Sequence, residues 1–222
     1  MLAAVIATLG LRAATLDDVL QRMDRGAKDF RSMTAKMNET DFDAVLNESD
    51  KSTGEVSMRK GRGGSITGKV VFSEPNPRTY FVKGHDAQVY YPKAKQVQIY
   101  DTGKLGPKQI DQILLMGFGT PVSEINKEYT IKLAGAESVN GVPATHIELT
   151  PKEASLKQYV AKVELWIPDG GTYPVREKVT AASNNYRLVD FSDVKANPVL
   201  PDSVFELNLP ADVEKIYPQK VK

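Results

Sequence analysis

A histidine and a nearby glutamate are the first candidates for acid–base chemistry in this sequence. His146 and Glu148 stand two positions apart in Ala144–Thr150, where apolar and polar residues alternate as in a β-strand. Residues i and i+2 of a strand share one face, so the pair has the spacing of a general acid and base, although ordinary surface partners share it. His85 lies in a predicted hairpin turn, Lys83-Gly84-His85-Asp86. Two histidines placed in this way give little support to a metal site.

A glycine-rich segment, Gly61-Arg62-Gly63-Gly64-Ser65, superficially resembles a phosphate-binding loop. No Lys-Ser or Lys-Thr follows it and no helix is signalled after it, although phosphate loops need both. Its serine directly follows a glycine, which also misses the Gly-x-Ser-x-Gly spacing of hydrolases. We therefore predict a flexible basic hairpin. The charges of Arg59, Lys60 and Arg62 favour a solvated loop, with a contact to an acidic partner or a lipid head group as the alternative.

The composition excludes several classes of catalytic and binding protein. The 222 residues contain no cysteine, so thiolate nucleophiles, disulfide scaffolds and iron–sulfur clusters are ruled out. The 29 basic and 28 acidic residues give a net charge of +1, unlike the one-signed surfaces of dedicated nucleic-acid binders. The sequence indicates no catalytic constellation, and we expect no enzymatic activity, no cofactor, no metal and no nucleic-acid partner.

One amphipathic helix and a long series of strands position these residues. From Thr15 to Phe30 the apolar residues follow helical spacing, with Thr15 as the N-cap. After Phe30 the period changes to two, which predicts a strand through Met37. Loops are expected where turn residues cluster, for example at Asn47–Ser52. Further strands are expected at 54–59, 68–73, 78–83, 87–91, 96–101, 129–135, 144–150, 159–167, 174–181 and 185–194.

A second helix interrupts the predicted strands. Pro107–Met116 carries apolar residues at helical spacing, and Gly117–Pro121 ends it because proline cannot continue a helix. About ten or eleven sequential strands without βαβ alternation predict one antiparallel sheet in a single domain over residues 15–222. A sheet of this length should curl into an unclosed β-barrel, and helices laid over its open side would form a lid that encloses a hydrophobic cavity.

Apolar side chains at alternate strand positions and on the helices are candidates for the wall of that cavity. Most such residues in sheet proteins belong to the plain core, and the pattern fits either place. Methionine and aromatic side chains would also suit acyl chains of varying shape. The candidates are Leu20, Met37, Met58, Phe72, Tyr80, Val82, Val89, Tyr91, Ile110, Leu114 and Phe118.

The first residues have the character of an export signal. Met1–Leu11 is an uncharged apolar run followed by small residues at Ala13 and Ala14. The run is shorter than the roughly 20 apolar residues that span a bilayer. We predict cleavage near Ala14, so that residues 1–14 are removed and the protein is exported to the periplasm. The alternative is a buried or frayed N-terminal helix.

The order of these features resembles that of the periplasmic outer-membrane lipoprotein carriers, the LolA-like proteins. The resemblance covers nearly the whole chain after the signal, and rests on the order and spacing of short motifs. These are DFRSMTA at 29–35, GEVSMRK at 54–60, DAQVYYP at 86–92 and LTPK at 149–152.

The resemblance implies a fold and a function. LolA-like proteins are unclosed antiparallel β-barrels with a helical lid, and their cavity takes the acyl chains of lipoproteins. They receive cargo from an inner-membrane ATP-driven release complex and pass it to an outer-membrane acceptor, without chemistry of their own. By this resemblance we expect a monomeric carrier whose partners are these two membrane components and the acyl chains of lipoproteins or lipids.

One position departs from the family pattern. In the family a basic residue, usually arginine followed by proline, ends the Gly-Asp/Glu strand and helps to hold the lid shut. The matching position is Lys60, preceded by Arg59 and followed by Gly61. Lysine lacks the planar fork of arginine, so either Arg59 takes this role or the lid is held differently. The chain resembles a divergent family member.

Three functional hypotheses follow from the sequence. The first is a carrier of lipoproteins or another acylated lipid between the two membranes. The second is a regulatory module of the same fold that senses lipoproteins or lipids. The third is a small-molecule enzyme that would use His146 or Glu148.

Overall fold

The computed structural model describes residues 14–61, 64–73, 75–84, 86–101 and 116–218. The helices are α1 (Leu16–Asp29), α3 (Val122–Glu128) and α4 (Ala154–Lys157), with short 3₁₀ turns η2 (Pro92–Ala94) and η3 (Asp202–Phe205). The strands are β1 (Ser32–Asp43), β2 (Glu48–Lys60), β3 (Ile66–Phe72), β4 (Arg78–Lys83), β5 (Asp86–Tyr91), β6 (Gln96–Asp101), β7 (Tyr129–Val139), β8 (Val142–Pro151), β9 (Val160–Pro168), β10 (Arg176–Ala181), β11 (Tyr186–Ala196) and β12 (Glu214–Ile216).

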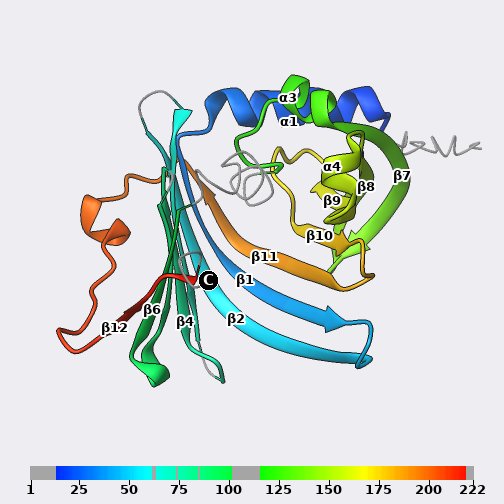
Figure 1. Ribbon diagram of the computed structural model, residues 1–222. Coiled ribbons are helices and arrows are strands. Elements are labelled where there is room, and N and C mark those ends of the chain that lie inside the picture. Colours follow the sequence, from blue (N-terminus) through cyan, green and yellow to red (C-terminus); the bar gives the residue numbers. More distant parts are fainter. Residues whose placement is uncertain (1–13, 62–63, 74, 85, 102–115, 219–222) are drawn as a thin grey trace, which may run out of the picture.

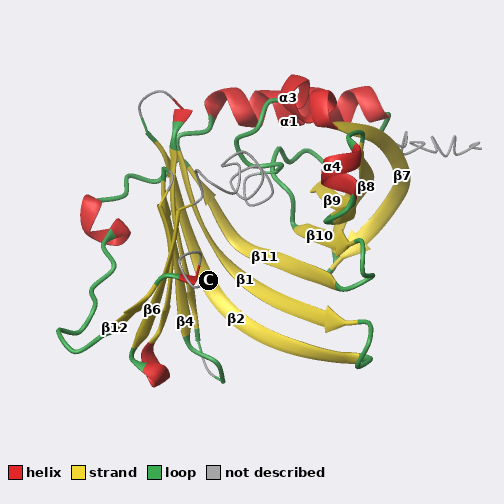
Figure 2. Ribbon diagram, viewed as in Figure 1, coloured by secondary structure: helices red, strands yellow, loops and turns green. Residues whose placement is uncertain are grey.

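All described strands belong to one sheet, in the order β12-β6-β5-β4-β3-β2-β1-β11-β10-β9-β8-β7. The order ends in β12 on one side and β7 on the other, so the sheet stays unclosed. It curves until the β4–β6 and β7–β9 portions face each other, and α1 and α3 lie across one end (Figures 1 and 2). This arrangement confirms the predicted unclosed barrel covered by helices.

The first helix forms as the sequence predicts. Thr15 caps α1 by a reciprocal pair of hydrogen bonds: its Oγ1 accepts from the backbone N–H of Asp18, and its own N–H donates to the Asp18 carboxylate. The buried face carries Val19, Met23 and Ala27 at spacings of four, which is the period of an amphipathic helix.

Several elements differ from the sequence prediction, among them the short helix α4, which was not predicted. The predicted loop at 47–52 is wrong, because β2 already begins at Glu48 and pairs with the whole length of β1 as far as Asp43. Helix α3 was not predicted: Pro121, interpreted from the sequence only as a stop, is the N-cap of this helix. Strand β12 was not predicted either, and it pairs parallel to β6, whereas the sequence indicated only antiparallel pairing.

The second helix predicted from the sequence, Pro107–Met116, lies outside the described residues except for its last position. Met116 itself is buried in a turn that leads towards α3. None of the helices in the described ranges is both long and apolar enough to cross a bilayer.

Two core clusters divide the concave side of the sheet. One joins α1 and α3 to β8 and β9 through residues such as Val19, Ile125, Leu149 and Val163. The other lies along β1–β3 and includes Met37, Met58 and Phe72. The helices therefore fill the concave side over β8 and β9, while the concave face of β1–β5, β10 and β11 remains available to line a cavity.

Candidate functional site: a cavity in the curved sheet

A cavity of about 970 Å³ lies against the concave face of the sheet. This volume is at the upper end of the roughly 300–1,000 Å³ typical of small-molecule sites. Its wall is mainly apolar and comes mostly from β1–β6, β10 and β11. The apolar and aromatic wall residues on these strands are Met37, Phe42, Val56, Met58, Ile66, Gly68, Val70, Phe72, Tyr80, Phe81, Val82, Ala87, Val89, Tyr91, Tyr100, Val179, Ala181, Tyr186, Val189 and Phe191.

The period of two in the strands explains why these residues share a wall. Gly68, Val70 and Phe72 alternate along β3 and face the cavity, while Val71 between them is 42% exposed on the outer side. Cross-strand register extends the wall, because Met37 on β1 stands directly opposite Phe191 on β11. Side chains from neighbouring strands therefore stand next to each other along the wall.

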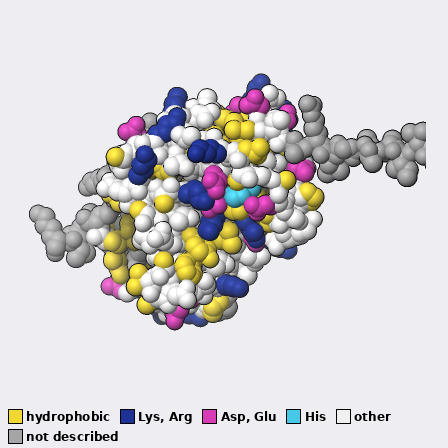
Figure 3. All heavy atoms as spheres, turned by 90° about the vertical axis from the view of Figure 1, so that its right-hand side faces the viewer, with side chains coloured by type: hydrophobic (Ala, Val, Ile, Leu, Met, Phe, Trp, Pro, Cys, Tyr) yellow, Lys and Arg dark blue, Asp and Glu magenta, His cyan; other side chains and the backbone are white. Residues whose placement is uncertain are grey.

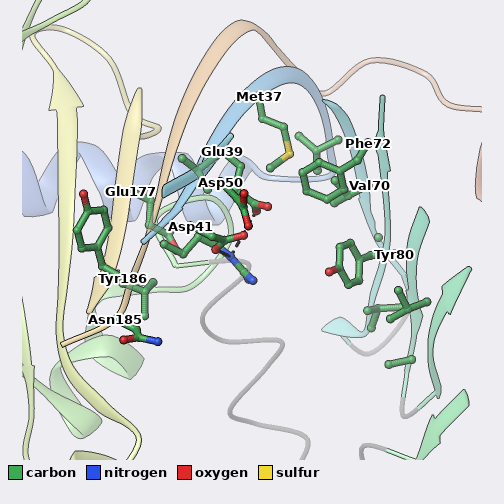
Figure 4. A pocket seen from close by; sticks show the side chains of 18 of the residues that line it. Met37, Glu39, Asp41, Asp50, Val70, Phe72, Tyr80, Glu177, Asn185 and Tyr186 are labelled. Carbon is green, nitrogen blue, oxygen red and sulfur yellow. Dashed lines mark hydrogen bonds and ion pairs between the residues drawn. The ribbon is translucent and has the colours of Figure 1, made fainter. Parts of the chain in front are cut away.

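The polarity of the wall changes along β1 and β11. On β1 the cavity-facing residues run from Met37 to Glu39 to Asp41, and Asp41 stands opposite Arg187 on β11. The end near the start of β1 is apolar, whereas the end near the β1–β2 hairpin carries charges. Figure 4 shows Glu39 and Asp41 close together, with Met37 beside them. The cavity is therefore amphipathic.

One buried ion pair, Arg78–Glu39, and the half-exposed Arg187 organise the charged end. Arg78 Nη2 donates to Glu39 Oε1 at 2.7 Å, and Arg187 Nε lies 3.4 Å from Glu39 Oε2 and 3.0 Å from Asp41 Oδ1. The Arg78 guanidinium also lies over the Phe72 ring, 3.8 Å from its centroid. Arg78 thus joins the charged end of the cavity to the apolar end.

Two carboxyl groups in the wall hold their protons to unusually high pH. Burial raises the pKa of Glu39 to about 7, although Arg187 and Arg78 oppose the shift. Burial likewise raises the pKa of Glu177 to about 8. The cross-strand neighbours of Glu177 are Leu165 and Val189, both buried and apolar. Near neutral pH Glu177 therefore presents a largely neutral group to the cavity.

Seven of the eleven predicted wall residues lie on this wall: Met37, Met58, Phe72, Tyr80, Val82, Val89 and Tyr91. Leu20 instead packs against the core cluster beneath α1. Phe118 is buried beside the cavity, where it stacks on Tyr173 and meets the edge of Phe191. Ile110 and Leu114 lie outside the described residues.

The structure adds residues that the sequence analysis did not single out. Val56, Gly68 and Val70 could have been found by extending the period of two along β2 and β3. Glu39 and Arg187 also line the cavity, but the sequence pattern could not indicate this, because charged residues that alternate along a strand normally face solvent.

The two predicted latch residues contact other parts of the chain. Arg59 Nη1 donates to the backbone carbonyl of Leu200 at 3.3 Å and forms an ion pair with Asp202 at 2.8 Å. Its guanidinium lies over the ring of Phe205. These partners belong to the C-terminal segment that follows β11 rather than to α1 or α3. The Lys60 side chain is exposed, and its backbone N–H donates to the carbonyl of Arg31.

The predicted acid–base pair lies away from the cavity. His146 and Glu148 alternate on β8 with Ile147 and Leu149, which face the core beneath α1. The pair is therefore on the outer face of the sheet. Neither residue contributes to the cavity wall.

An unclosed, strongly curved antiparallel sheet with helices over one end and an amphipathic cavity inside is the architecture that the resemblance to LolA-like proteins implied. Comparison with known proteins gives a family model and several structures of similar fold. The family model described as "Predicted periplasmic protein (DUF2092)" matches residues 118–217, which agrees with the periplasmic location predicted from the sequence. A search of curated proteins found no match.

Three solved structures are similar to this chain at the level of the fold. An uncharacterized conserved protein from Thermus thermophilus has 11% identity, with 90% of this chain and 98% of that chain covered and a TM-score of 0.54. MucB has 15% identity, with 90% of this chain and 64% of that chain covered and a TM-score of 0.53. The lipoprotein LppX from Mycobacterium tuberculosis has 16% identity, with 84% of this chain and 99% of that chain covered and a TM-score of 0.50. At these identities the likeness extends to the fold alone.

Proposed function

We propose that this protein is a periplasmic carrier that holds the acyl chains of lipoproteins, or of another acylated lipid, in its cavity and moves them from the inner to the outer membrane. The observation that carries this proposal is the mainly apolar cavity of about 970 Å³ inside an open sheet. A soluble carrier has to keep acyl chains away from water, and such a wall does so.

The polarity of the wall gives the ligand an orientation. The acyl chain lies against Met37, Phe72 and their neighbours at the apolar end. The polar part of the ligand, where the chain joins its head group, lies near Glu39, Asp41 and Arg187. A ligand with a charged or hydrogen-bonding head group would fit better than a plain hydrocarbon, because it can pair with these groups.

Release needs a change in the protein. Each buried methylene contributes about 0.8 kcal/mol, so a long acyl chain in a rigid cavity would bind too tightly to leave. Part of the binding free energy therefore has to be spent on opening the helices that cover one end of the sheet. We assign this role to α1 and α3, and we expect the inner-membrane ATP-driven release complex and the outer-membrane acceptor to act as donor and recipient.

A substitution that fills the cavity tests the proposal. A Cβ atom at Gly68 would meet only Met58 Cγ at 3.7 Å, so Gly68→Trp can place a large ring inside the cavity without disturbing the backbone. Val71→Trp adds a similar ring on the outer face of the same strand and is the matched control. Purified parent and Val71→Trp proteins should extract a fluorescent lipoprotein or acyl lipid from vesicles into a soluble complex, and Gly68→Trp should extract far less. Equal extraction by both variants would contradict the proposal.

The second candidate function is a regulatory module that senses lipoproteins or lipids. It is favoured by the likeness of fold to MucB, which has also been solved in complex with the periplasmic part of MucA. A sensor should form a stable complex with a membrane protein and should not pass its ligand on. Labelled lipid that moves from donor to acceptor vesicles in the presence of the protein supports the carrier, and retention of the lipid in a ternary complex supports the sensor.

A further inference from the structure

A histidine and several charged side chains gather on the outer face of β8 and β9, on the side of the sheet away from the cavity. His146 and Glu148 come from β8, and Glu164 and Lys162 come from β9. Glu137 from β7 completes the group through its contact with His146. Figure 3 shows a histidine on this side of the molecule with acidic and basic side chains around it.

The strand register brings two carboxylates face to face. Glu148 stands directly opposite Glu164, and His146 stands opposite Trp166. These are consecutive pairs on the same face of the sheet. Like charges at directly opposed positions of a sheet are destabilising, so a cation beside the two carboxylates would stabilise them. The repulsion is weakly screened by water, because the Glu164 side chain is only 9% exposed.

The other contact of His146 fixes which ring nitrogen carries the proton. His146 Nδ1 lies 2.8 Å from Glu137 Oε1, and Trp166 Nε1 donates to Glu137 Oε2 at 2.8 Å. A Glu137 carboxylate accepts from Nδ1–H, and in this tautomer the lone pair of the neutral ring is on Nε2. Metal-binding histidines commonly have such a carboxylate behind them.

His146 Nε2 is buried and has no hydrogen-bond partner among the described residues. The side chain is 9% exposed, and Nε2 lies 3.3 Å from Glu164 Oε1. One ligand atom from each of His146, Glu148 and Glu164 can be chosen so that all lie within 4.8 Å of one another. Tetrahedral zinc, with bonds of about 2.0–2.2 Å, places neighbouring ligand atoms about 3.4 Å apart.

We propose that His146, Glu148 and Glu164 form a binding site for a divalent transition-metal ion such as Zn²⁺, with Glu137 as the positioning residue for the histidine. Lys162 competes for the same place, since its Nζ lies 3.0 Å from Glu148 and 3.1 Å from Glu164. The Lys162 side chain is 35% exposed, so it can turn out to solvent when the metal enters. Three protein ligands leave a fourth position for water.

The single tryptophan makes this site easy to observe. Trp166 is the one tryptophan of the sequence, and its ring stacks on His146 with centroids 4.2 Å apart. Addition of ZnCl₂ to the metal-free full chain should change Trp166 fluorescence and saturate at one equivalent, with the same stoichiometry by calorimetry. Zn²⁺ should also raise the melting temperature, because an ion that binds the folded state stabilises it.

Three variants distinguish a built site from adventitious binding. Glu148→Gln removes a ligand and should weaken Zn²⁺ binding by on the order of 10- to 100-fold, and Glu137→Gln should weaken it by a similar factor. Lys162→Met removes the competing cation and should tighten binding by about tenfold or more. Glu55→Gln, which changes an exposed glutamate on β2, is the matched control and should leave binding unchanged.

The proposal is overturned if no one-to-one Zn²⁺ complex forms, or if Glu148→Gln binds as tightly as Glu55→Gln. It is also overturned if Lys162→Met binds no more tightly than the parent. Glu148 and Lys162 both have about a third of their side chains exposed, so their variants should fold even where a change at the buried His146 would not. Circular dichroism of each variant without metal checks this.

Discussion

Glu177 is a buried carboxyl group whose ionisation should govern how stability depends on pH. Its folded-state pKa of about 8 is above the ordinary value, so between roughly pH 4.5 and 8 the folded state binds more protons than the unfolded state. The contribution of this group is therefore fully present at low pH and is lost as pH rises towards 8. We expect Glu177→Gln, which cannot ionise, to remove this loss.

Denaturant unfolding at pH 5.5 and pH 8.5 measures the effect of Glu177→Gln. The free energy of unfolding of the parent should decrease over this interval by roughly 2–4 kcal/mol more than that of the variant, since each pKa unit corresponds to about 1.4 kcal/mol. Glu55→Gln on the outer face of β2 should follow the parent. A variant with the same pH dependence as the parent would show that Glu177 is ionised in the folded protein.

Arg78 is the closer and more buried of the two arginines that pair with the buried Glu39. It donates to Glu39 and to Ser52 Oγ, and its guanidinium covers the Phe72 ring. We expect Arg78→Met to lower the free energy of unfolding by about 3 kcal/mol at pH 8, because the buried Glu39 then keeps only its longer contact to the half-exposed Arg187. At pH 5 Glu39 is protonated and the loss should be smaller.

A double-mutant cycle checks the origin of the Arg78 effect. Arg78→Met combined with Glu39→Gln should recover most of the stability that Arg78→Met alone loses at pH 8, because both partners of the ion pair are then uncharged. If the two losses simply add, the role of Arg78 is packing on Phe72 rather than neutralisation of Glu39.

At the scale of elements, hydrogen bonds and buried apolar side chains fasten α1 over the end of the sheet. Arg22 Nε donates to the carbonyl of Gly171, Tyr173 Oη donates to the carbonyl of Gly26, and the backbone N–H of Val122 donates to Asp24 Oδ1. Asn197 Nδ2 also donates to the carbonyl of Asp29, the last residue of α1. These four hydrogen bonds, together with the buried face of Val19 and Met23, hold the helix in place, whereas Arg59 and Lys60 donate to residues outside it. The four hydrogen bonds are the ones to break if α1 moves during loading and release.

Tyr173→Phe is the mildest way to loosen α1. It removes one hydrogen bond but keeps the ring that packs against Phe30 and Phe118. We expect amide hydrogen exchange in α1 to accelerate about two- to tenfold, which corresponds to roughly 0.5–1.5 kcal/mol of local stability. Acyl-lipid uptake should become faster, while Tyr90→Phe on β5, outside the cavity wall, should change neither rate. Unchanged exchange in α1 would show that this bond does not hold the helix.

The sequence predicted the elements whose signals are local. The N-cap Thr15 and the apolar positions that follow it were sufficient for α1, and strands β4 and β6 have the predicted bounds. Helix α3 was missed because Pro121 was interpreted only as a stop, although Val122 and Ile125 have the spacing of a buried helical face. Strand β12 has three residues and is held by pairing with β6, which leaves little trace in its own sequence.

At the scale of the whole molecule, the concave face of the sheet is covered by helices over some strands and encloses a cavity over others. The concave face of β8 and β9 is covered by α1 and α3, whereas the concave face of β1–β5 and β11 encloses the cavity. Period-two patterns predicted which side chains share a face, and seven wall residues were found in that way. They could not predict that Glu39 and Arg187 face inward, because this depends on how far the sheet curls and on the partner that each charge meets.

The central claim is that the cavity holds acyl chains, and native mass spectrometry of the protein purified from its own periplasm tests it most directly. The account predicts that parent and Val71→Trp proteins carry an added mass whose fragments include fatty-acyl chains, and that Gly68→Trp carries much less. Bare protein in all three samples, or the same acylated mass on Gly68→Trp as on Val71→Trp, would contradict it.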